Sequence, residues 1–260
     1  MSTARDDSTT RTSGGLYVYG IVPADVEPQE HATGVGDPPG EIAVVRHGEI
    51  AALVSDIPDR PLGTPEDLTA HAELLDGSAA VAPVLPLRFG AVMRGAESVA
   101  EELLGANLDE FRSALEQLEG RAQFVVKGRY SEQTILPEVL AENPEADRLR
   151  EQIRANGPDA ARDARMALGE HIYHALEAKR AADTRRVADA LESLRFVVSA
   201  RPPTNDLDAV HLAVLVELSR QAELEQALSE LIAQWDGRVE VELLGPMAAY
   251  DFVMKREPEG

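Results

Sequence analysis

Two histidines on an expected helix are the first residues whose spacing could support chemistry. His171 and His174 lie three positions apart, beside Glu170 and Glu177. Residues three or four positions apart share one face of a helix, so two imidazoles and a carboxylate could bind a metal ion there. Such spacing is common on polar helices, and a solvated face without a metal is the simpler interpretation. We therefore predict no metal site and no bound cofactor.

The other reactive side chains form no recognisable catalytic motif. The chain has no cysteine, which excludes thiolate ligands and thiol nucleophiles. No serine lies in a Gly-x-Ser-x-Gly elbow, and no glycine cluster matches a phosphate-binding loop. His71 shares a helical face with Leu68 and Leu75, so we expect a partly buried, hydrogen-bonded side chain, and His211 in an apolar strand is interpreted in the same way. We predict that the protein has no catalytic residues and is not an enzyme.

The apolar stretch Val84–Gly90, VLPLRFG, contains a single charge, Arg88. An arginine in this setting could bind an anion, join a buried ion pair, or extend its head group into water. Pro86 limits strand pairing and Gly90 permits a turn. We expect Arg88 to pair with an acid or with backbone carbonyls and so to fix that turn, with His71 nearby. Contact with a partner protein is the alternative role.

The composition excludes two classes of partner. Asp and Glu number 46 against 25 Lys and Arg, which gives a formal net charge of −21. The negative charge is spread over both halves of the chain and would repel phosphate backbones and anionic lipid. Hence we expect neither a nucleic-acid partner nor a membrane partner. The polar N-terminus has no hydrophobic segment of a secretory signal, so we expect a cytoplasmic protein.

The first half of the chain predicts an α+β domain of ferredoxin-like character over residues 15–130. Residues 1–14 are rich in Ser, Thr, Asp and Gly and are expected to form a disordered tail. The pattern after them mixes β-branched runs with helical periodicity. The expected elements are a strand at 16–23, a hairpin over 41–57 turning at His47-Gly48, a helix at 64–77, a strand at 81–89, one or two helices over 99–118 with a possible break at Gly105, and a strand at 122–130.

The second half predicts a helical segment followed by a second α+β domain. Residues 131–194 are helix-forming, with an interruption at 156–158 and a thinner apolar pattern at 177–186 that could mark a turn. Residues 195–260 then read as strand, strand, helix and strand, which suggests a second ferredoxin-like domain. The predicted fold class is therefore α+β, with two related domains and a helical connecting segment that belongs to the C-terminal half.

Several segments, in this order and spacing, resemble the gas vesicle protein family of the L/F type. They are LYVYGIVP, GEIAALVSDIP, VAPVLPLRFGAVM preceded by a histidine, FVVKGRY and LLGPMAAYDFV, which together span residues 15–253. The most specific pieces are VLPLRFG with its upstream histidine and the C-terminal Gly-Pro followed by Tyr-x-Phe. The residues that carry the resemblance, and that could contact a partner, are His71, Pro86, Arg88, Phe89, Gly90, Gly245, Pro246, Tyr250 and Phe252.

The resemblance implies a non-enzymatic accessory or minor structural component of gas vesicles. It implies an N-terminal ferredoxin-like domain and an α+β C-terminal domain. The expected role is to help nucleate and assemble the shell by binding the major hydrophobic shell protein and limiting its aggregation. Other gas vesicle accessory proteins are further expected partners. The alternative is a sensor that binds a small molecule between two ferredoxin-like domains.

Overall fold

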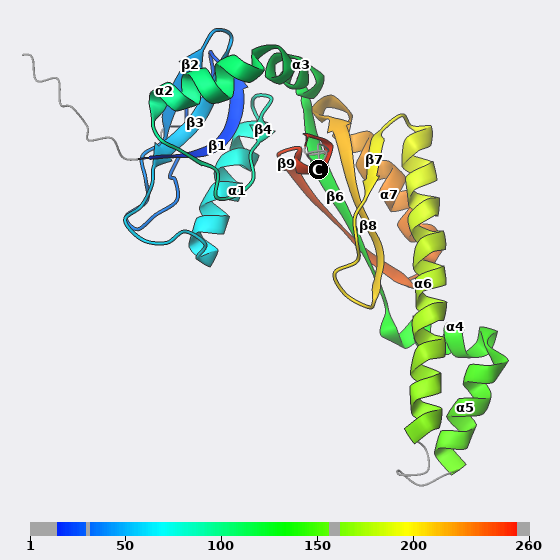
Figure 1. The fold of residues 1–260 in the computed structure, drawn as a ribbon. Helices are drawn as coiled ribbons and strands as arrows, with labels where there is room; N and C mark the ends of the chain where they lie inside the picture. The colour runs from blue at the N-terminus through cyan, green and yellow to red at the C-terminus, as the bar shows by residue number, and fades with distance from the viewer. Residues whose placement is uncertain (1–14, 30–31, 156–161, 254–260) are drawn as a thin grey trace, which may run out of the picture. The chain divides into compact units, whose positions relative to one another are not determined.

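The computed structural model describes residues 15–29, 32–155 and 162–253, and these form two compact units (Figure 1). The first unit comprises residues up to 122 together with the C-terminal segment from 246, and the second comprises 123–245. The tail expected at residues 1–14 and the helix interruption expected at 156–158 lie outside the described residues. Each unit contains one β-sheet and its own helices, so the α+β fold class is confirmed.

The sheet of the first unit is antiparallel throughout its order, β2-β3-β1-β4, with β5 also paired to β1. The hairpin between β2 and β3 turns at Gly48, where φ is +61°, as the His47-Gly48 pair predicts. Its strands are β1 (Leu16–Pro23), β2 (Ala43–His47), β3 (Ile50–Asp56), β4 (Leu85–Pro86) and β5 (Val92–Met93).

Helix α1 (Pro65–Ala79) begins with a capping box. The Thr64 side chain accepts a hydrogen bond from the backbone of Asp67, and the Asp67 carboxylate accepts one from the backbone of Thr64. The strand expected over 81–89 is limited to Leu85–Pro86, and this prediction was too long. The backbone amides of Val81 and Ala82 bond back to Ser78, and the two prolines have no amide proton to offer a neighbouring strand.

The helical stretch after β5 is irregular around Gly105, where the sequence predicted a possible break. It consists of α2 (Ala96–Ser98), a π-helical turn η1 (Val99–Leu104), a 3-10 turn η2 (Gly105–Asn107) and α3 (Leu108–Leu118). A Cβ at Gly105 would lie 3.2 Å from the ring of His47, so glycine lets this turn approach the end of β2.

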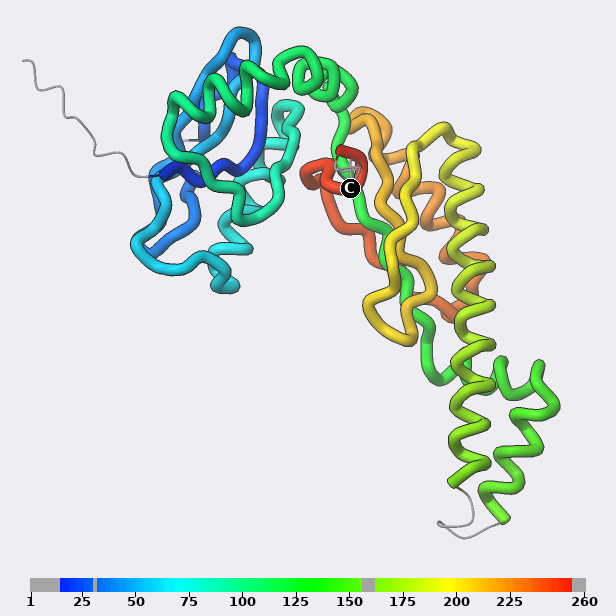
Figure 2. Tube along the Cα trace, viewed as in Figure 1, coloured from blue at the N-terminus to red at the C-terminus, as the bar shows by residue number. Residues whose placement is uncertain are grey.

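The second unit is built on the strand order β7-β8-β6-β9. Helices α6 and α7 lie on the same face of this sheet, and α5 runs antiparallel beside the first part of α6 (Figures 1 and 2). The elements are β6 (Arg121–Tyr130), α4 (Glu132–Glu142), α5 (Pro144–Ala155), α6 (Arg162–Ser193), β7 (Val197–Ala200), β8 (Asp208–Glu217), η3 (Leu218–Arg220), α7 (Gln221–Trp235), β9 (Val239–Met247) and, in the first unit, α8 (Tyr250–Val253).

Strand β6 belongs to the second sheet, whereas the sequence placed it at the end of the first domain. It lies between β8 and β9, and residues 122–126 are all buried. The division therefore falls at residue 122 instead of 130, and the last residues from 246 return to the first unit instead of closing the second. The physical reason is pairing: a strand buried along most of its length needs a neighbour on each edge, which only the later strands supply.

With β6 as its first strand, the second sheet has the same strand order as the first. Numbered along the chain within each unit, both sheets read 2-3-1-4, the order of a ferredoxin-like β-α-β-β-α-β fold. Helices α4 to α6 thus form the first crossover of the second sheet. Helix α6 continues through 177–186, where a turn was considered, because Arg180 bonds the carbonyls of Asp206 and Asp208 and Asp183 is buried below it.

Candidate functional site

The motif histidine lies in a buried aromatic cluster of the first unit. His71 from α1 stacks on Tyr19 with ring centroids 5.7 Å apart, and its ring edge meets Tyr17 of β1 and Phe89 of the turn after β4 at 5.7 and 5.6 Å. The Tyr17 hydroxyl is 2.9 Å from Nδ1 of His71. The expectation of a buried, hydrogen-bonded histidine is therefore correct.

The polar groups of this cluster are neutral. Burial raises the pKa of Tyr17 to about 12. Burial also lowers the pKa of His71, although the nearby carbonyl of Leu87 opposes this. A neutral phenol donates a hydrogen bond to Nδ1 of the neutral imidazole and accepts one from the backbone amide of Gly90, at 3.2 Å. One hydroxyl thus connects β1, α1 and the turn.

The turn itself, Leu87–Ala91, is fixed to β1 by its backbone. The amide of Leu87 donates to the carbonyl of Tyr19 at 2.9 Å, and the carbonyl of Ala91 accepts from Val18 at 2.9 Å. Gly90 has a φ of +90°, a conformation that other residues rarely adopt. We call this segment the arginine turn, because Arg88 lies at its exposed position.

Arg88 does not form the ion pair that the sequence predicted. Its side chain is exposed, and within the described part of the chain its guanidinium has no hydrogen bond or ion pair. The turn is fixed by Tyr17 and by backbone bonds instead, and the residue near His71 is Phe89. The result is a free cation presented on a rigid backbone.

A buried carboxylate, Asp67, stabilises the first turn of α1. Asp67 is 1% exposed and accepts two hydrogen bonds from Arg60, at 2.7 and 2.8 Å. The amides of Gly36, Gly63 and Thr64 also donate to it, at 3.1 to 3.2 Å. The Arg60 guanidinium holds the pKa of Asp67 well below its usual range, burial opposes this, and the three amides add to the lowering.

The C-terminal motif is divided between the units. Gly245 ends the second unit with a φ of +134°, and a Cβ there would lie 2.9 Å from the carbonyl of Gln123. Pro246 and the residues after it belong to the first unit, where the amide of Ala248 donates to Asp76 at 2.9 Å. Tyr250 packs against the cluster that contains Tyr17 and Phe89, and burial raises its pKa.

The structure therefore brings several of the predicted site residues together and leaves others apart. His71, Phe89, Gly90 and Tyr250 converge on the core of the first unit. Pro86 is buried in β4, which α8 contacts, and Phe252 is half-buried in α8. Gly245 lies on the second sheet. Within the arginine turn, Arg88 and Gly90 are exposed, and Arg88 carries its only charge.

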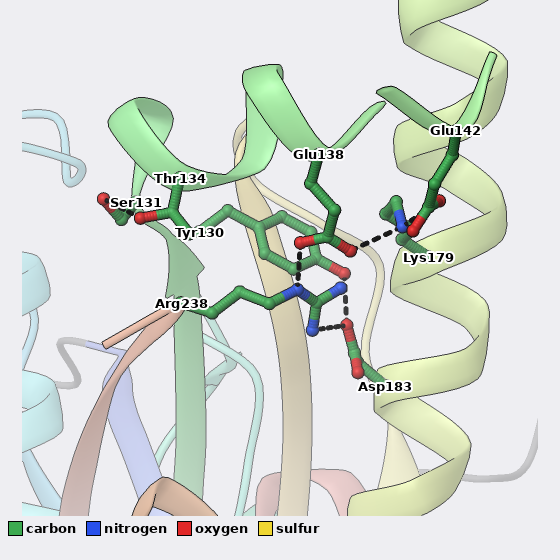
Figure 3. A network of polar contacts seen from close by, with 8 residues as sticks. All are labelled: Tyr130, Ser131, Thr134, Glu138, Glu142, Lys179, Asp183 and Arg238. Atoms are coloured by element: carbon green, nitrogen blue, oxygen red, sulfur yellow. Dashed lines mark hydrogen bonds and ion pairs between the residues drawn. The ribbon is translucent and has the colours of Figure 1, made fainter. Parts of the chain in front are cut away.

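A second polar cluster, in the second unit, was not found from the sequence (Figure 3). Arg238 at the start of β9 donates to Glu138 of α4 at 2.8 Å and to Asp183 of α6 at 2.9 Å. Tyr130 at the end of β6 donates to the same Asp183 oxygen at 2.7 Å. Lys179 of α6 bridges Glu138 and Glu142, each at 2.6 Å.

The charges of this network compensate one another. Burial opposes ionisation of Glu138, but Lys179 and Arg238 together hold its pKa below the usual range. Burial and the hydrogen bond to Asp183 raise the pKa of Tyr130. The arrangement fastens α4 and α6 to the ends of two strands and leaves no carboxylate of the network without a cation. No spacing in the sequence predicts it, because its directly bonded partners lie up to 100 residues apart.

The histidine pair of α6 does not assemble a ligand set. His174 lies 3.9 Å from Glu170 and 4.0 Å from Glu177 on an exposed surface, and no group of three candidate metal ligands occurs among the described residues. Among the residues that the structure describes, no helix is both long enough and apolar enough to cross a bilayer.

Comparisons with known proteins agree over almost the whole chain. The family model described as gas vesicle synthesis protein GvpL/GvpF matches residues 15–254. Gas vesicle protein F of Streptomyces sp. (strain CB03234) is 31% identical, with 91% of this chain and 98% of that protein covered. Gas vesicle protein L of the same strain is 30% identical, with 91% of each covered. The crystal structure of GvpF from Anabaena sp. PCC7120 has the same fold, with a TM-score of 0.75 at 22% identity over 94% of this chain and all of that one.

Proposed function

We propose that this chain, which belongs to the gas vesicle synthesis protein GvpL/GvpF family, assists nucleation and assembly of the gas vesicle shell. It would do so by binding the major hydrophobic shell protein and limiting its aggregation, in the cytoplasm and at the growing vesicle. Other gas vesicle accessory proteins would be further partners. The proposed role is an accessory or minor structural one, without enzymatic activity.

The observation that carries this proposal is the arginine turn. Two tyrosines, a histidine and a glycine of unusual conformation hold a short turn in place, yet the charge at its tip contacts nothing in the described chain. The backbone of the turn is already ordered by these bonds, so a partner that pairs with Arg88 has to immobilise only its side chain. Contact with a partner, the alternative role of Arg88, is therefore the better interpretation.

The remaining features suit a protein that holds an aggregation-prone partner. The chain carries a net charge of −21, which keeps it soluble while apolar side chains contact another protein. Val81, Val92 and Leu68 of the first unit are at least half exposed. Polar surfaces interrupted by such apolar positions are typical of interaction sites.

The buried position of the aromatic cluster supports a structural use of its polar groups. Tyr17 is fully buried and His71 is 4% exposed, so a substrate has no access to their hydrogen bond in this conformation. Both groups are neutral and bonded to each other. A general base instead needs reach to a substrate proton.

Co-purification of the shell protein with a tagged chain from vesicle-forming cells tests the proposal. We expect Arg88→Glu to reduce recovery of the shell protein by about tenfold or more, which corresponds to the loss of one or two charge-assisted contacts. Arg185→Glu, an exposed arginine of α6 in the second unit, is the matched control and should recover normal amounts. Equal recovery with Arg88→Glu and wild type would remove the arginine turn from the interface.

A further inference from the structure

An open groove in the first unit is lined by apolar and charged side chains together. It measures about 570 Å³ and lies where the ends of β1 and β3, the segment after α1 and the last turns of α3 meet. Ile50, Val81 and Leu115 line it together with Val26. A second hollow of about 210 Å³, beside α1, is lined by the same Val26 and Val81. The two hollows therefore form one surface, which we call the valine groove.

Val81 is displayed in this groove on a fixed backbone. It is 74% exposed, the largest fraction among the large hydrophobic residues of the described chain. Its amide donates to the carbonyl of Ser78 at 3.1 Å, and the next amide donates to the same carbonyl at 2.9 Å. Because the backbone is already ordered, burying this side chain against a partner requires no folding of a loop. An exposed apolar side chain in such a hollow is a feature of interaction surfaces.

The rim of the valine groove is negative. Asp25 and Glu119 line the larger hollow and Glu73 the smaller one, and none of them has a cationic partner in the part of the chain that the structure describes. The arginine of the larger hollow, Arg112, is already engaged by Glu49 at 3.3 Å and by Asp109 at 3.1 Å. The free charge around the groove is therefore acidic.

Charge complementarity selects the occupant. An acidic rim attracts basic side chains and repels phosphates and carboxylates. A second copy of this chain carries the same net charge of −21 and would be repelled as well. An apolar floor below an acidic rim fits a helix or extended segment with apolar and basic side chains on one face.

We propose that the valine groove binds a segment of a partner protein that presents apolar and basic side chains together, as a cationic amphipathic helix does. The valine groove is a second contact surface, distinct from the arginine turn. The groove attracts basic side chains, whereas the arginine turn attracts acidic ones. The inference goes beyond the proposed function, since it concerns the chemistry of the bound segment and holds whether or not that segment belongs to the shell protein.

The test uses synthetic peptides with the full-length protein. A fluorescent amphipathic peptide of leucine and lysine, about 18 residues or five helical turns long, is titrated at about 0.15 M salt and followed by anisotropy. One comparison peptide replaces lysine by glutamate, and another replaces leucine by serine. We expect the leucine-lysine peptide to bind at least about tenfold more tightly than either, because the groove requires both properties.

Matched variants locate the binding. Val81→Asp and, separately, Asp25→Lys/Glu119→Lys should each weaken binding of the leucine-lysine peptide by about tenfold or more. The controls are Val197→Asp, at a residue 50% exposed on β7, and Glu192→Lys/Glu240→Lys, which makes the same charge change on the second unit. The controls should bind within about twofold of wild type, and thermal unfolding verifies the fold of each variant.

Two results would overturn the proposal. Equal weakening by the test and control variants would mean that the peptide responds only to net charge. Equal binding of the serine-lysine peptide would mean that the apolar side chains of the groove do not contribute to binding. Both results leave the proposed function standing, since these peptides contain no gas vesicle sequence and shell-protein recovery is measured separately with Arg88→Glu.

Discussion

At the scale of single residues, the Tyr17 hydroxyl connects three segments of the first unit. It donates to His71 and accepts from the backbone of Gly90, so one buried oxygen holds α1 and the arginine turn on β1. Replacing it removes a partner from the buried imidazole of His71 and from the Gly90 amide at once, which costs more than the loss of an exposed hydrogen bond. The turn that presents Arg88 depends on this oxygen together with its two backbone hydrogen bonds to β1.

Tyr17→Phe is expected to lower the free energy of unfolding by about 1–3 kcal/mol, since Nδ1 of His71 and the Gly90 amide lose their partner. Urea denaturation measures this. Tyr173→Phe is the control, because Tyr173 is exposed and bonds only Glu177 of its own helix, and it should change stability by less than about 0.5 kcal/mol. Similar small effects of both substitutions would contradict the account of the cluster.

The lowered pKa of Asp67 makes the stability of the fold depend on pH. A carboxylate whose pKa is lowered in the folded state stabilises the protein fully above its unfolded pKa, near 3.9, and less as the pH falls toward the folded value. Asp67→Asn should therefore cost about 2–4 kcal/mol at pH 7. Its difference from wild type should shrink as the pH falls below about 4.

Urea titrations of wild type and Asp67→Asn at several pH values measure this difference. Asp59→Asn serves as the control, since Asp59 is exposed. A difference that stays constant or widens in acid would show that the Asp67 charge does not stabilise the fold.

Residue-level predictions from the sequence succeeded where helical periodicity determined the environment. His71 is buried and hydrogen-bonded, as expected from the face of α1 that it shares with Leu75, although Leu68, predicted on the same face, is 50% exposed. The pairing expected for Arg88, with an acid or with backbone carbonyls, was wrong, because whether such an acceptor reaches a guanidinium depends on how distant segments pack. Arg88 has apolar neighbours in the sequence, but it lies in a turn, and its side chain is exposed.

At the scale of elements, the network around Arg238 joins two strands to two helices. Its contacts link the start of β9 and the end of β6 to α4 and α6, and Arg238 also lies over the ring of Tyr130 at 5.2 Å. Breaking one side of a partly buried ion pair leaves the other charge poorly solvated. The position of α6 on the sheet therefore depends on the network.

Arg238→Met should destabilise the second unit by about 2–4 kcal/mol, because Asp183 keeps its charge and loses its cation. Arg238→Met/Asp183→Leu should recover part of that loss, since both charges are then removed. Urea denaturation and hydrogen exchange of the α6 amides measure the stability of the single and of the double variant. If the double variant loses more unfolding free energy than the two single variants lose together, compensation between these residues is refuted.

Elements with strong local signals were predicted closely, and those that depend on pairing were not. The capping residues of α1 and the turn at His47-Gly48 are local, and the structure shows both. The strand expected over 81–89 is only two residues long, since Val84 and Leu85 pack in the core without a continuous ladder and Val81 is exposed. Apolar composition indicates burial but does not by itself distinguish a strand from a buried turn.

At the scale of the whole molecule, each unit has its own sheet with the same order of strands. The sequence suggested two related folds, but it gave β6 to the wrong one, because a buried strand carries no mark of which sheet will pair with it. The family resemblance was carried by the turn of VLPLRFG and the C-terminal Gly-Pro, and the family match over residues 15–254 confirms it.

The division at residue 122 can be tested with fragments of the second unit. Residues 123–245 should unfold cooperatively, since they retain most of β6 between β8 and β9. Residues 131–245 should show no cooperative transition, because the sheet lacks the strand that joins β8 to β9. Circular dichroism during urea titration compares the two. Equal cooperativity of both fragments would restore the boundary at 130.

The central claim is a role in building gas vesicles, and flotation of a gene-deletion strain tests it most directly. We predict that deleting the gene abolishes buoyancy and intact vesicles, and that the wild-type gene restores both. A gene encoding Arg88→Glu should restore neither, whereas Arg185→Glu should restore both. A deletion strain that floats as wild type does, with vesicles of normal number, would contradict the account.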